Sequence, residues 1–386
     1  MAIKKLIIVG TLVLLVSFLL PACAPQAKAV KLKPLLPDFD YADWYQSKTG
    51  WEVENYFGAW VLTAHKENVY IGFGSNAPSR APGDGALLAR VSGNQIEVVS
   101  TLDEQGIHTM VWHNDTLYIP GIDPHFDDGW DAGNFYRFVP PNDFKKFRYD
   151  KDGKAILPNV LHLIGLYVDP SSGVIYTTSW GGESADNPDF LLISTNRGES
   201  WEISAVPYKS GFGRIIEFNG VLYGANLDGW RQGMTTESIK YSKDRGKSWH
   251  ELMYNQKPIH SITDFTIFKG ELVLLSNLLR IGYKIDKSGH IEDFFIPSFR
   301  GISWPTSHWY VNIEDKFFVI LSASQFYLTK DLNQWQSFGK EAHEKAGVDF
   351  FHIMGYWPYK KSLLLSVVGT NGGIWTYSLD DLFAEP

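Results

Sequence analysis

The stretch Trp60-Val-Leu-Thr-Ala-His-Lys-Glu-Asn-Val-Tyr70-Ile-Gly consists of an apolar strand, a short polar turn and a second apolar strand. The unit returns as Met110-Val-Trp-His-Asn-Asp-Thr-Leu-Tyr118-Ile-Pro-Gly and as Ile216-Glu-Phe-Asn-Gly-Val-Leu-Tyr223-Gly-Ala. Weaker copies cover residues 166–178, 265–276, 311–322 and 354–367. Pairs such as Asn219-Gly220 separate the strands, and a tight hairpin needs the positive φ that these residues adopt. Each unit is therefore predicted to be a β-hairpin.

Seven copies of this unit follow one another along the chain, at the period of about 45 residues that is typical of propeller blades. A sheet of four strands cannot bury both of its faces alone, but sheets stacked around an axis can. The spacing is too regular for a β-sandwich, and a solenoid is the other competitor. We therefore predict an all-β fold, a seven-bladed β-propeller of four-stranded antiparallel blades, with six blades as the alternative.

A second repeat lies in the middle and C-terminal half of the chain. Ser194-Thr-Asn196-Arg-Gly198-Glu-Ser-Trp201 and Ser242-Lys-Asp244-Arg-Gly246-Lys-Ser-Trp249 begin 48 residues apart, and Thr329-Lys-Asp331-Leu-Asn-Gln-Trp335 is one residue shorter. The Asp or Asn side chain is expected to cap the turn amides, Gly to take a left-handed conformation, and Trp to pack between sheets.

These octads resemble the Asp-box, or BNR, repeats of sialidase-like β-propellers. The resemblance implies the fold and places these turns on the face away from a substrate. It implies sialidase activity only if an arginine cluster introduced by Phe-Arg-Ile-Pro is present. That motif is absent, the early blade has only Arg80 and Arg90, and Phe299-Arg300-Gly301-Ile302 lacks the Pro. We therefore predict no sialidase activity.

The N-terminus has the three parts of a secretory signal. Lys4 and Lys5 precede an apolar run that is too short to span a membrane comfortably, and a small residue precedes the break. Leu20-Pro21-Ala22-Cys23 resembles a bacterial lipobox, although Pro21 is unusual there and leaves plain secretion or an uncleaved anchor as alternatives. We predict a signal peptide over 1–22, Cys23 as lipid acceptor, a tether and lead-in over 23–50, and the propeller over 51–386.

The expected location is therefore the bacterial cell envelope, as an outward-facing lipoprotein that meets the membrane through its lipid anchor only.

Cys23 is the only cysteine, so no internal disulfide can form and the fold must be stabilised by core burial. Removal of Lys4 and Lys5 with the signal takes the net charge from −8 to −10. An acidic chain argues against a nucleic-acid partner. We expect a monomer with a glycan or protein ligand.

Alignment of the blades places five histidines near the start of an innermost strand: His108, His162, His260, His308 and His352. Arg214 holds or neighbours the same position in another blade. Converging imidazoles suit a transition metal, for which His108, His162, His308 and His352 are the candidate ligands. They suit general acid/base catalysis equally. The plainer interpretation is that each His fills a strand-entry position and bonds to a backbone carbonyl.

The early blades have long loops after their second strands, and these are expected to rise on one face. The candidate ligand-binding residues there are Trp130, Trp180, Trp230, Arg231, Arg80 and Glu183. Indoles flanked by polar groups can stack on sugar rings, although each Trp could instead pack between blades. Asp123, Asp127, Asp128 and Asp131 could hold Ca²⁺, but an acidic solvated loop is the commoner explanation.

Two functions follow as hypotheses. The first is a surface-anchored propeller that binds a glycan or an envelope or protein partner on its loop-rich face. The alternative is an enzyme with a His-lined axial site, either metal-dependent or a hydrolase or lyase acting on polysaccharide. Whether the protein is an enzyme, and which of the candidate residues would then be catalytic, stays open at this point.

Overall fold

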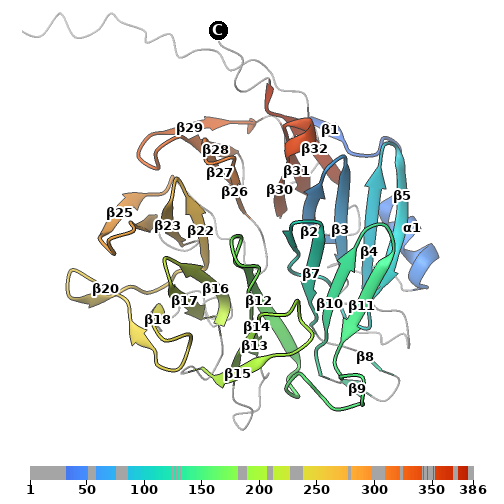
Figure 1. The fold of residues 1–386 in the computed structure, drawn as a ribbon. Coiled ribbons are helices and arrows are strands. Elements are labelled where there is room, and N and C mark those ends of the chain that lie inside the picture. The colour runs from blue at the N-terminus through green and yellow to red at the C-terminus, as the bar shows by residue number, and fades with distance from the viewer. Residues whose placement is uncertain are drawn as a thin grey trace, which may run out of the picture.

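The computed structural model confirms the seven-bladed propeller. It describes residues 32–50, 58–74, 86–122, 125–126, 129–130, 132–180, 189–206, 212–226, 238–276, 280–297, 309–321, 325–340, 342, 346, 351, 353–367 and 373–380. Seven antiparallel sheets of four strands follow one another around a common axis (Figure 1). The sheets are numbered here as blades 1 to 7 in chain order.

Within a blade, successive strands run outward from the axis. Blade 1 contains β2 (Gly58–His65), β3 (Asn68–Gly74), β4 (Leu87–Ser92) and β5 (Gln95–Thr101). Blade 2 contains β6 (Val111–His113), β7 (Thr116–Pro120), β10 (Phe135–Val139) and β11 (Asp143–Phe147). Blade 3 contains β12 (His162–Val168), β13 (Ile175–Trp180), β14 (Phe190–Ser194) and β15 (Glu202–Ala205). Blade 4 contains β16 (Phe212–Phe218), β17 (Val221–Asn226), β18 (Lys240–Ser242) and β19 (His250–Glu251).

The later blades repeat this order. Blade 5 contains β22 (Asp264–Phe268), β23 (Glu271–Leu275), β24 (Ile281–Ile285) and β25 (Ile291–Phe295). Blade 6 contains β26 (Tyr310–Ile313), β27 (Phe317–Leu321), β28 (Phe326–Thr329) and β29 (Trp335–Phe338). Blade 7 contains β30 (Ile353–Trp357), β31 (Ser362–Ser366) and β32 (Ile374–Ser378), with the 3₁₀ turn η1 (Pro358–Lys360) between the first two. Two small hairpins, β8 (His125–Phe126) with β9 (Gly129–Trp130) and β20 (Met253–Tyr254) with β21 (Lys257–Pro258), lie outside the blades.

The fourth strand of blade 7 comes from the other end of the chain. Strand β1 (Leu32–Pro34) pairs antiparallel with β32, with Leu32 opposite Tyr377 and Pro34 opposite Trp375. Without β1, β32 would leave a row of unpaired backbone groups at a sheet edge. The range 23–50 that the sequence assigned to a tether and lead-in thus contains, from Leu32 onward, part of the folded propeller.

Helix α1 (Tyr41–Thr49) follows β1 and packs against blade 1. Asp40 caps its first turn by accepting hydrogen bonds from the amides of Ala42 and Asp43, and Gly50 ends it at φ 73°. Tyr45 is fully buried, and its ring lies 6.0 Å from that of Phe73 at the end of β3. Residues 32–50 therefore contribute to the packing of both blade 7 and blade 1.

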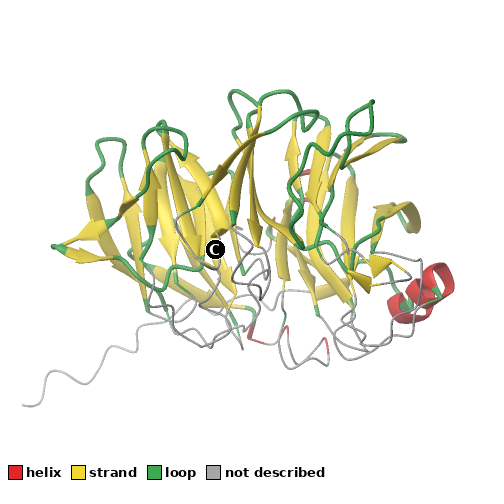
Figure 2. Ribbon diagram, turned by 90° about the horizontal axis from the view of Figure 1, so that it is seen from below, coloured by secondary structure: helices red, strands yellow, loops and turns green. Residues whose placement is uncertain are grey.

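The strand register gives the disc two different faces. Each first strand begins where the second strand ends: Gly58 pairs with Gly74 in blade 1, and His162 with Trp180 in blade 3. We call this end of the blades the loop face. The opposite end, which carries the turns between the first and second strands and between the third and fourth strands, is the turn face. Figure 2 shows the described turns at one side of the disc and α1 toward the other.

The third-to-fourth strand turns on the turn face have the geometry expected of the octads. Asn196 accepts from the Ser200 amide at 3.0 Å, and Asp244 accepts from the Ser248 amide at 2.8 Å. Gly198 and Gly246 have φ of 88° and 84°. The Trp201 ring packs edge-on against Phe135 of blade 2, with centroids 4.9 Å apart. These residues therefore stabilise the turns and the contact between blades.

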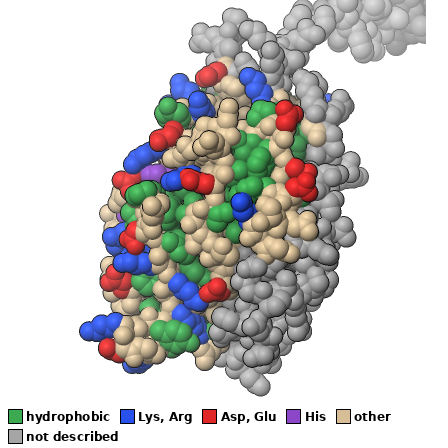
Figure 3. Space-filling view, turned by 90° about the vertical axis from the view of Figure 1, so that its right-hand side faces the viewer, with side chains coloured by type: hydrophobic (Ala, Val, Ile, Leu, Met, Phe, Trp, Pro, Cys, Tyr) green, Lys and Arg blue, Asp and Glu red, His purple; other side chains and the backbone are tan. Residues whose placement is uncertain are grey.

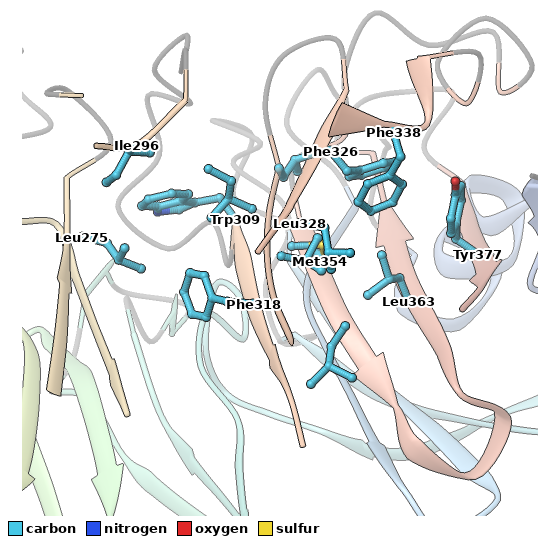
Figure 4. Packing of buried hydrophobic residues seen from close by; sticks show 14 of the residues in the cluster. Leu275, Ile296, Trp309, Phe318, Phe326, Leu328, Phe338, Met354, Leu363 and Tyr377 are labelled. Atoms are coloured by element: carbon cyan, nitrogen blue, oxygen red, sulfur yellow. The ribbon is translucent and has the colours of Figure 1, made fainter. Parts of the chain in front are cut away.

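Large buried side chains fill the space between neighbouring sheets. Between blades 5 and 6, Trp309 and Phe318 pack beside Leu275 and Ile296, and between blades 6 and 7, Phe326 lies against Phe338 and Tyr377 (Figure 4). Burial of each such side chain contributes roughly 1.5–3 kcal/mol. In the described part of the chain, no helix has both the length and the apolar character needed to cross a membrane.

Candidate functional site

Polar side chains from five blades lie where the first strands begin, at the loop face. They are His108 and Thr109 before β6, His162 at the start of β12, Arg214 in β16, Asp264 at the start of β22 and Tyr310 at the start of β26. We call these six residues the axial set. First strands line the axis of a propeller, so the axial set marks the loop-side mouth of the central channel.

Three members of the axial set form one hydrogen-bonded group across blades 4, 5 and 6. Arg214 donates from Nε to Oδ1 of Asp264 at 3.1 Å, and the Tyr310 hydroxyl lies 3.2 Å from the same oxygen. Tyr310 also donates to the Phe265 carbonyl at 2.7 Å, and the Phe265 amide donates to Asp264 at 2.9 Å. A carboxylate that is 5% exposed is thus paired with a cation and held in a fixed orientation.

Desolvation, followed by the charge of Asp264, raises the pKa of Tyr310 well above its usual value. The phenol is therefore protonated at neutral pH and serves as a hydrogen-bond donor.

The backbone of β16 also contributes to the hydrogen-bonded group of Arg214, Asp264 and Tyr310. Its register shifts between Phe212 and Arg214, and Arg214 donates from Nη1 to the Gly213 carbonyl. Such bulges redirect a side chain and are common beside binding sites.

His108 packs against the first strand of blade 1. Its ring centroid lies 4.4 Å from that of Trp60 in β2, and both residues are buried. Gly106 allows this arrangement, because a Cβ atom at that position would come 2.0 Å from Cζ3 of Trp60. The segment 102–106 is fixed by bridges from Gly106 to Gly74 and to Ile122. His108 precedes β6, the first strand of blade 2, and its role in a site stays a prediction.

His162 and Trp180 are brought together by the register of blade 3, in which they are opposite partners on β12 and β13. His162 is buried and also bridges to Ile122 of blade 2. A candidate axial residue and a candidate loop residue are thus neighbours. The structure describes the backbone of Trp180 but not its side chain.

The structure places His260 in the connection that leads to the inner strand of blade 5. His260 forms an antiparallel bridge with Ser238, next to the third strand of blade 4, and the inner strand of blade 5 begins only at Asp264. The displacement arises because the β20–β21 hairpin lengthens the connection between the two blades. His260 therefore pairs with blade 4 before the chain enters β22, Asp264 takes the strand-entry position, and a functional role of His260 stays a prediction.

Most of the remaining candidates lie outside the described residues. These are His308, His352, Arg80, Glu183, Trp230, Arg231, Cys23, Asp123, Asp127, Asp128 and Asp131. Trp130 lies in β9, of which only the backbone is described. Among the residues with described side chains, no three His, Cys, Asp or Glu lie close enough together to hold a metal ion.

Sequence reasoning missed Asp264 and Tyr310, as well as a buried acid between blades 1 and 2. Glu104 lies between β5 and β6 and is fully buried. Its Oε1 accepts from Nδ2 of Asn134 at 2.7 Å and from the Tyr136 hydroxyl at 3.0 Å, whereas Oε2 has no partner among the described residues. Burial raises the pKa of Glu104 to about 8, so it is mostly protonated at neutral pH.

Alignment at the strand entries could have identified Asp264 and Tyr310, because they hold that position in blades 5 and 6. Glu104 carries no comparable signal.

The rim of the disc carries mixed charge: on the side seen in Figure 3, Lys and Arg alternate with Asp and Glu over the described surface. Arg90 with Glu97 and Lys146 with Asp103 are pairs of this kind.

Solved structures with the same fold include two lyases. The chain resembles a streptogramin B lyase with a TM-score of 0.54 and 14% identity, covering 85% of this chain and 96% of that one. A catalytically inactive variant of virginiamycin B lyase from Staphylococcus aureus, crystallised with quinupristin, gives 0.53 and 12%, covering 90% and 99%. At these identities the likeness shows the fold alone.

A third solved structure is an extracellular domain from B. thetaiotaomicron assigned to a one-component system. It gives a TM-score of 0.55 at 11% identity and covers 91% of this chain but 42% of that one. This similarity likewise shows the propeller fold and no more.

Among curated proteins, the chain resembles vacuolar protein sorting/targeting protein 10 of two fungi. It is 23% identical over 181 residues to that of Colletotrichum graminicola and 24% over 182 residues to that of Verticillium alfalfae. These matches cover 47% of this chain but only 11% and 12% of the relatives' own lengths. No family model matches the chain. The comparisons thus show the β-propeller fold, and the Asp-box repeat stays a prediction.

Proposed function

We propose that this protein is an exported, lipid-anchored β-propeller that binds a glycan or an envelope or protein partner on its loop face. The observation that carries the proposal is the asymmetry of the disc. Polar side chains of five blades gather at the loop-side mouth of the channel, whereas hydrogen bonds within the turns occupy the polar groups of the octads on the turn face.

A glycan is the first ligand to test. Sugars are recognised by fixed hydrogen-bond donors and acceptors next to aromatic faces. Arg214, Asp264 and Tyr310 supply such polar groups in a preorganised arrangement. The sequence adds Trp230 and Arg231 to a neighbouring loop, and Trp180 ends strand β13. The similarity to an extracellular domain of a one-component system fits an exported binding domain.

The test measures binding of the mature chain to a panel of polysaccharides and envelope proteins. Trp230→Ala and Tyr310→Phe are expected to weaken binding about tenfold or more, because each removes a contact at the loop face. Lys243→Ala on the turn face is the matched control and should bind normally. Failure to bind any member of the panel, or equal binding by all variants, would count against the proposal.

An enzyme is the second candidate, and the observation that favours it is the set of titratable groups beside the channel. His108, His162 and Tyr310 could move protons during hydrolysis or elimination of a polysaccharide. Product analysis after incubation with the same panel separates this candidate from simple binding. Elemental analysis of the purified protein tests its metal-dependent form, for which His108, His162, His308 and His352 are the proposed ligands.

A further inference from the structure

The direction of strand β1 fixes the end of the disc from which the N-terminal segment leaves the fold. Leu32 pairs with Tyr377, and Ser378 pairs with Ser362 beside the turn that joins β30 to β31. Ile374, at the other end of β32, pairs with Ser366 on the loop side. Leu32 therefore lies at the turn face of blade 7, and Pro34 lies nearer the loop face.

The length of the connecting segment then favours the turn face as the one that lies against a membrane. Eight residues lie between Cys23 and Leu32, and the nine residue-to-residue steps of a fully extended chain span at most about 30 Å. A strand of eight residues such as β2 is about 26 Å long. A lipid on Cys23 could reach the loop face only if the segment ran back along nearly the whole height of a blade, whereas the turn face is adjacent.

The side chains at this end of blade 7 suit a lipid surface. Tyr359 is 63% exposed, and Nζ of Lys360 lies 5.5 Å from the centre of its ring. Lys361 and Lys33 are exposed as well. An exposed acid, Asp380, lies close to Lys361, because the amide of the preceding residue, Leu379, donates to the Lys361 carbonyl. The acid on the neighbouring turn, Glu314, is paired with Lys316 at 3.0 Å. Exposed Tyr and Lys are the residues that favour the headgroup region of a bilayer.

We propose that the turn face of blade 7 contacts the surface of an anionic membrane through Tyr359, Lys360 and Lys361, and that the loop face is directed away from the bilayer. This orientation rests on the lipid anchor in the proposed function. It leaves the axial set open to a ligand arriving from outside the membrane.

The test uses the lipidated full chain in vesicles of phosphatidylcholine and phosphatidylglycerol that contain a lipid-borne quencher. A thiol-reactive fluorophore is attached to Tyr359→Cys on the turn face or to Gln46→Cys on the exposed side of α1, toward the loop face. Strong quenching at position 359 with little at position 46 is expected. Equal quenching, or stronger quenching at position 46, would overturn the orientation.

Two controls distinguish failure of the proposed orientation from failure of the proposed lipid anchor. The intact mass of the chain reports whether Cys23 carries lipid; a mass without lipid would overturn both the anchor and the orientation. A lipid-bearing protein that is quenched at position 46 would overturn the orientation alone. Reversal of charge by Lys360→Glu with Lys361→Glu should lower the quenching at position 359, whereas Lys243→Glu with Lys247→Glu in blade 4 should not. No difference between the two pairs would contradict a role for these lysines.

Discussion

At the residue scale, the most consequential side chain is a buried acid. Glu104 contacts Tyr136 of β10 and Asn134, the residue before that strand, and the charge of Lys146 on β11 lowers its pKa only weakly against burial. Lys146 already pairs with Asp103 at 2.7 Å. Within the described part of the chain, no cation is therefore hydrogen-bonded to the Glu104 carboxyl, which explains why its protonated form is favoured.

Stability should consequently depend on pH through Glu104. The folded-state pKa of about 8 exceeds the ordinary value of 4.5, so the folded protein retains a proton that the unfolded chain releases. This contribution is fully present below about pH 4.5 and is lost as pH rises to about 8, at a cost on the order of 5 kcal/mol. Glu104→Gln keeps the acceptor and removes the titration. Urea unfolding at pH 5 and pH 8.5 should show that the free energy of unfolding of the variant, relative to that of the wild type, is higher at pH 8.5 than at pH 5. A constant difference would contradict the prediction.

A second residue-scale prediction concerns Gly106. A methyl group there would clash with the buried ring of Trp60, which cannot move without disturbing His108. We expect Gly106→Ala to reduce the free energy of unfolding by roughly 1–3 kcal/mol and to weaken ligand binding at the loop face. Chemical denaturation and the binding panel measure the two effects. Wild-type values in both would show that the wall of the channel adapts.

At the element scale, the turns show how far local sequence predicts structure. Asn219 and Gly220 have φ of 53° and 77°, and Lys269 and Gly270 have 53° and 74°, as tight hairpins require. Such turns need only two or three residues in the right order, so the sequence predicts them well. The place of His260 could not be predicted in the same way, because it depends on the added β20–β21 hairpin and on pairing with Ser238 in another segment.

The octad of blade 4 allows a prediction at this scale. Hydrogen bonds from the Ser248 hydroxyl and amide and from the Ser242 hydroxyl lower the pKa of Asp244 to about 2. Its contribution to stability is present above about pH 4, the ordinary range of the group, and is lost as pH falls toward 2. Asp244→Ala should lower the melting temperature at pH 7 more than Asp244→Asn, because Asn196 makes the equivalent bond in blade 3. Thermal unfolding of both variants from pH 2 to pH 7 tests this. Equal losses would show that the turn does not use the side-chain acceptor.

At the scale of the whole molecule, the ring depends on a strand of three residues. β1 pairs with β32, and Leu32 packs against the cluster of blades 6 and 7. The sequence could not predict this pairing, because Leu32-Lys33-Pro34 is too short to show a period and its partner is more than 340 residues away. Blade count and blade order, in contrast, follow from the repeat itself.

Removal of β1 should therefore destabilise the whole ring. A chain that begins at Leu35 loses the β1–β32 bonds and the packing of Leu32 but keeps the Asp40 cap of α1, and we expect a reduction of roughly 2–4 kcal/mol in the free energy of unfolding. A chain that begins at residue 31 is the matched control. Urea unfolding compares the two, and light scattering should reveal association through the uncovered edge of β32. Identical stability would show that blade 7 is complete with three strands.

The same strand sets the order of events during folding. β1 is synthesised first, but its partner β32 emerges only after the other six blades have been made. The hydrogen bond from Thr376 to the Lys33 carbonyl thus joins a segment that is synthesised early to one that is synthesised late. Contacts of such high sequence separation form slowly, because the cost of closing the loop comes first. Blades 1 to 6 can assemble as the polypeptide appears, whereas ring closure must wait for the last strand to be released.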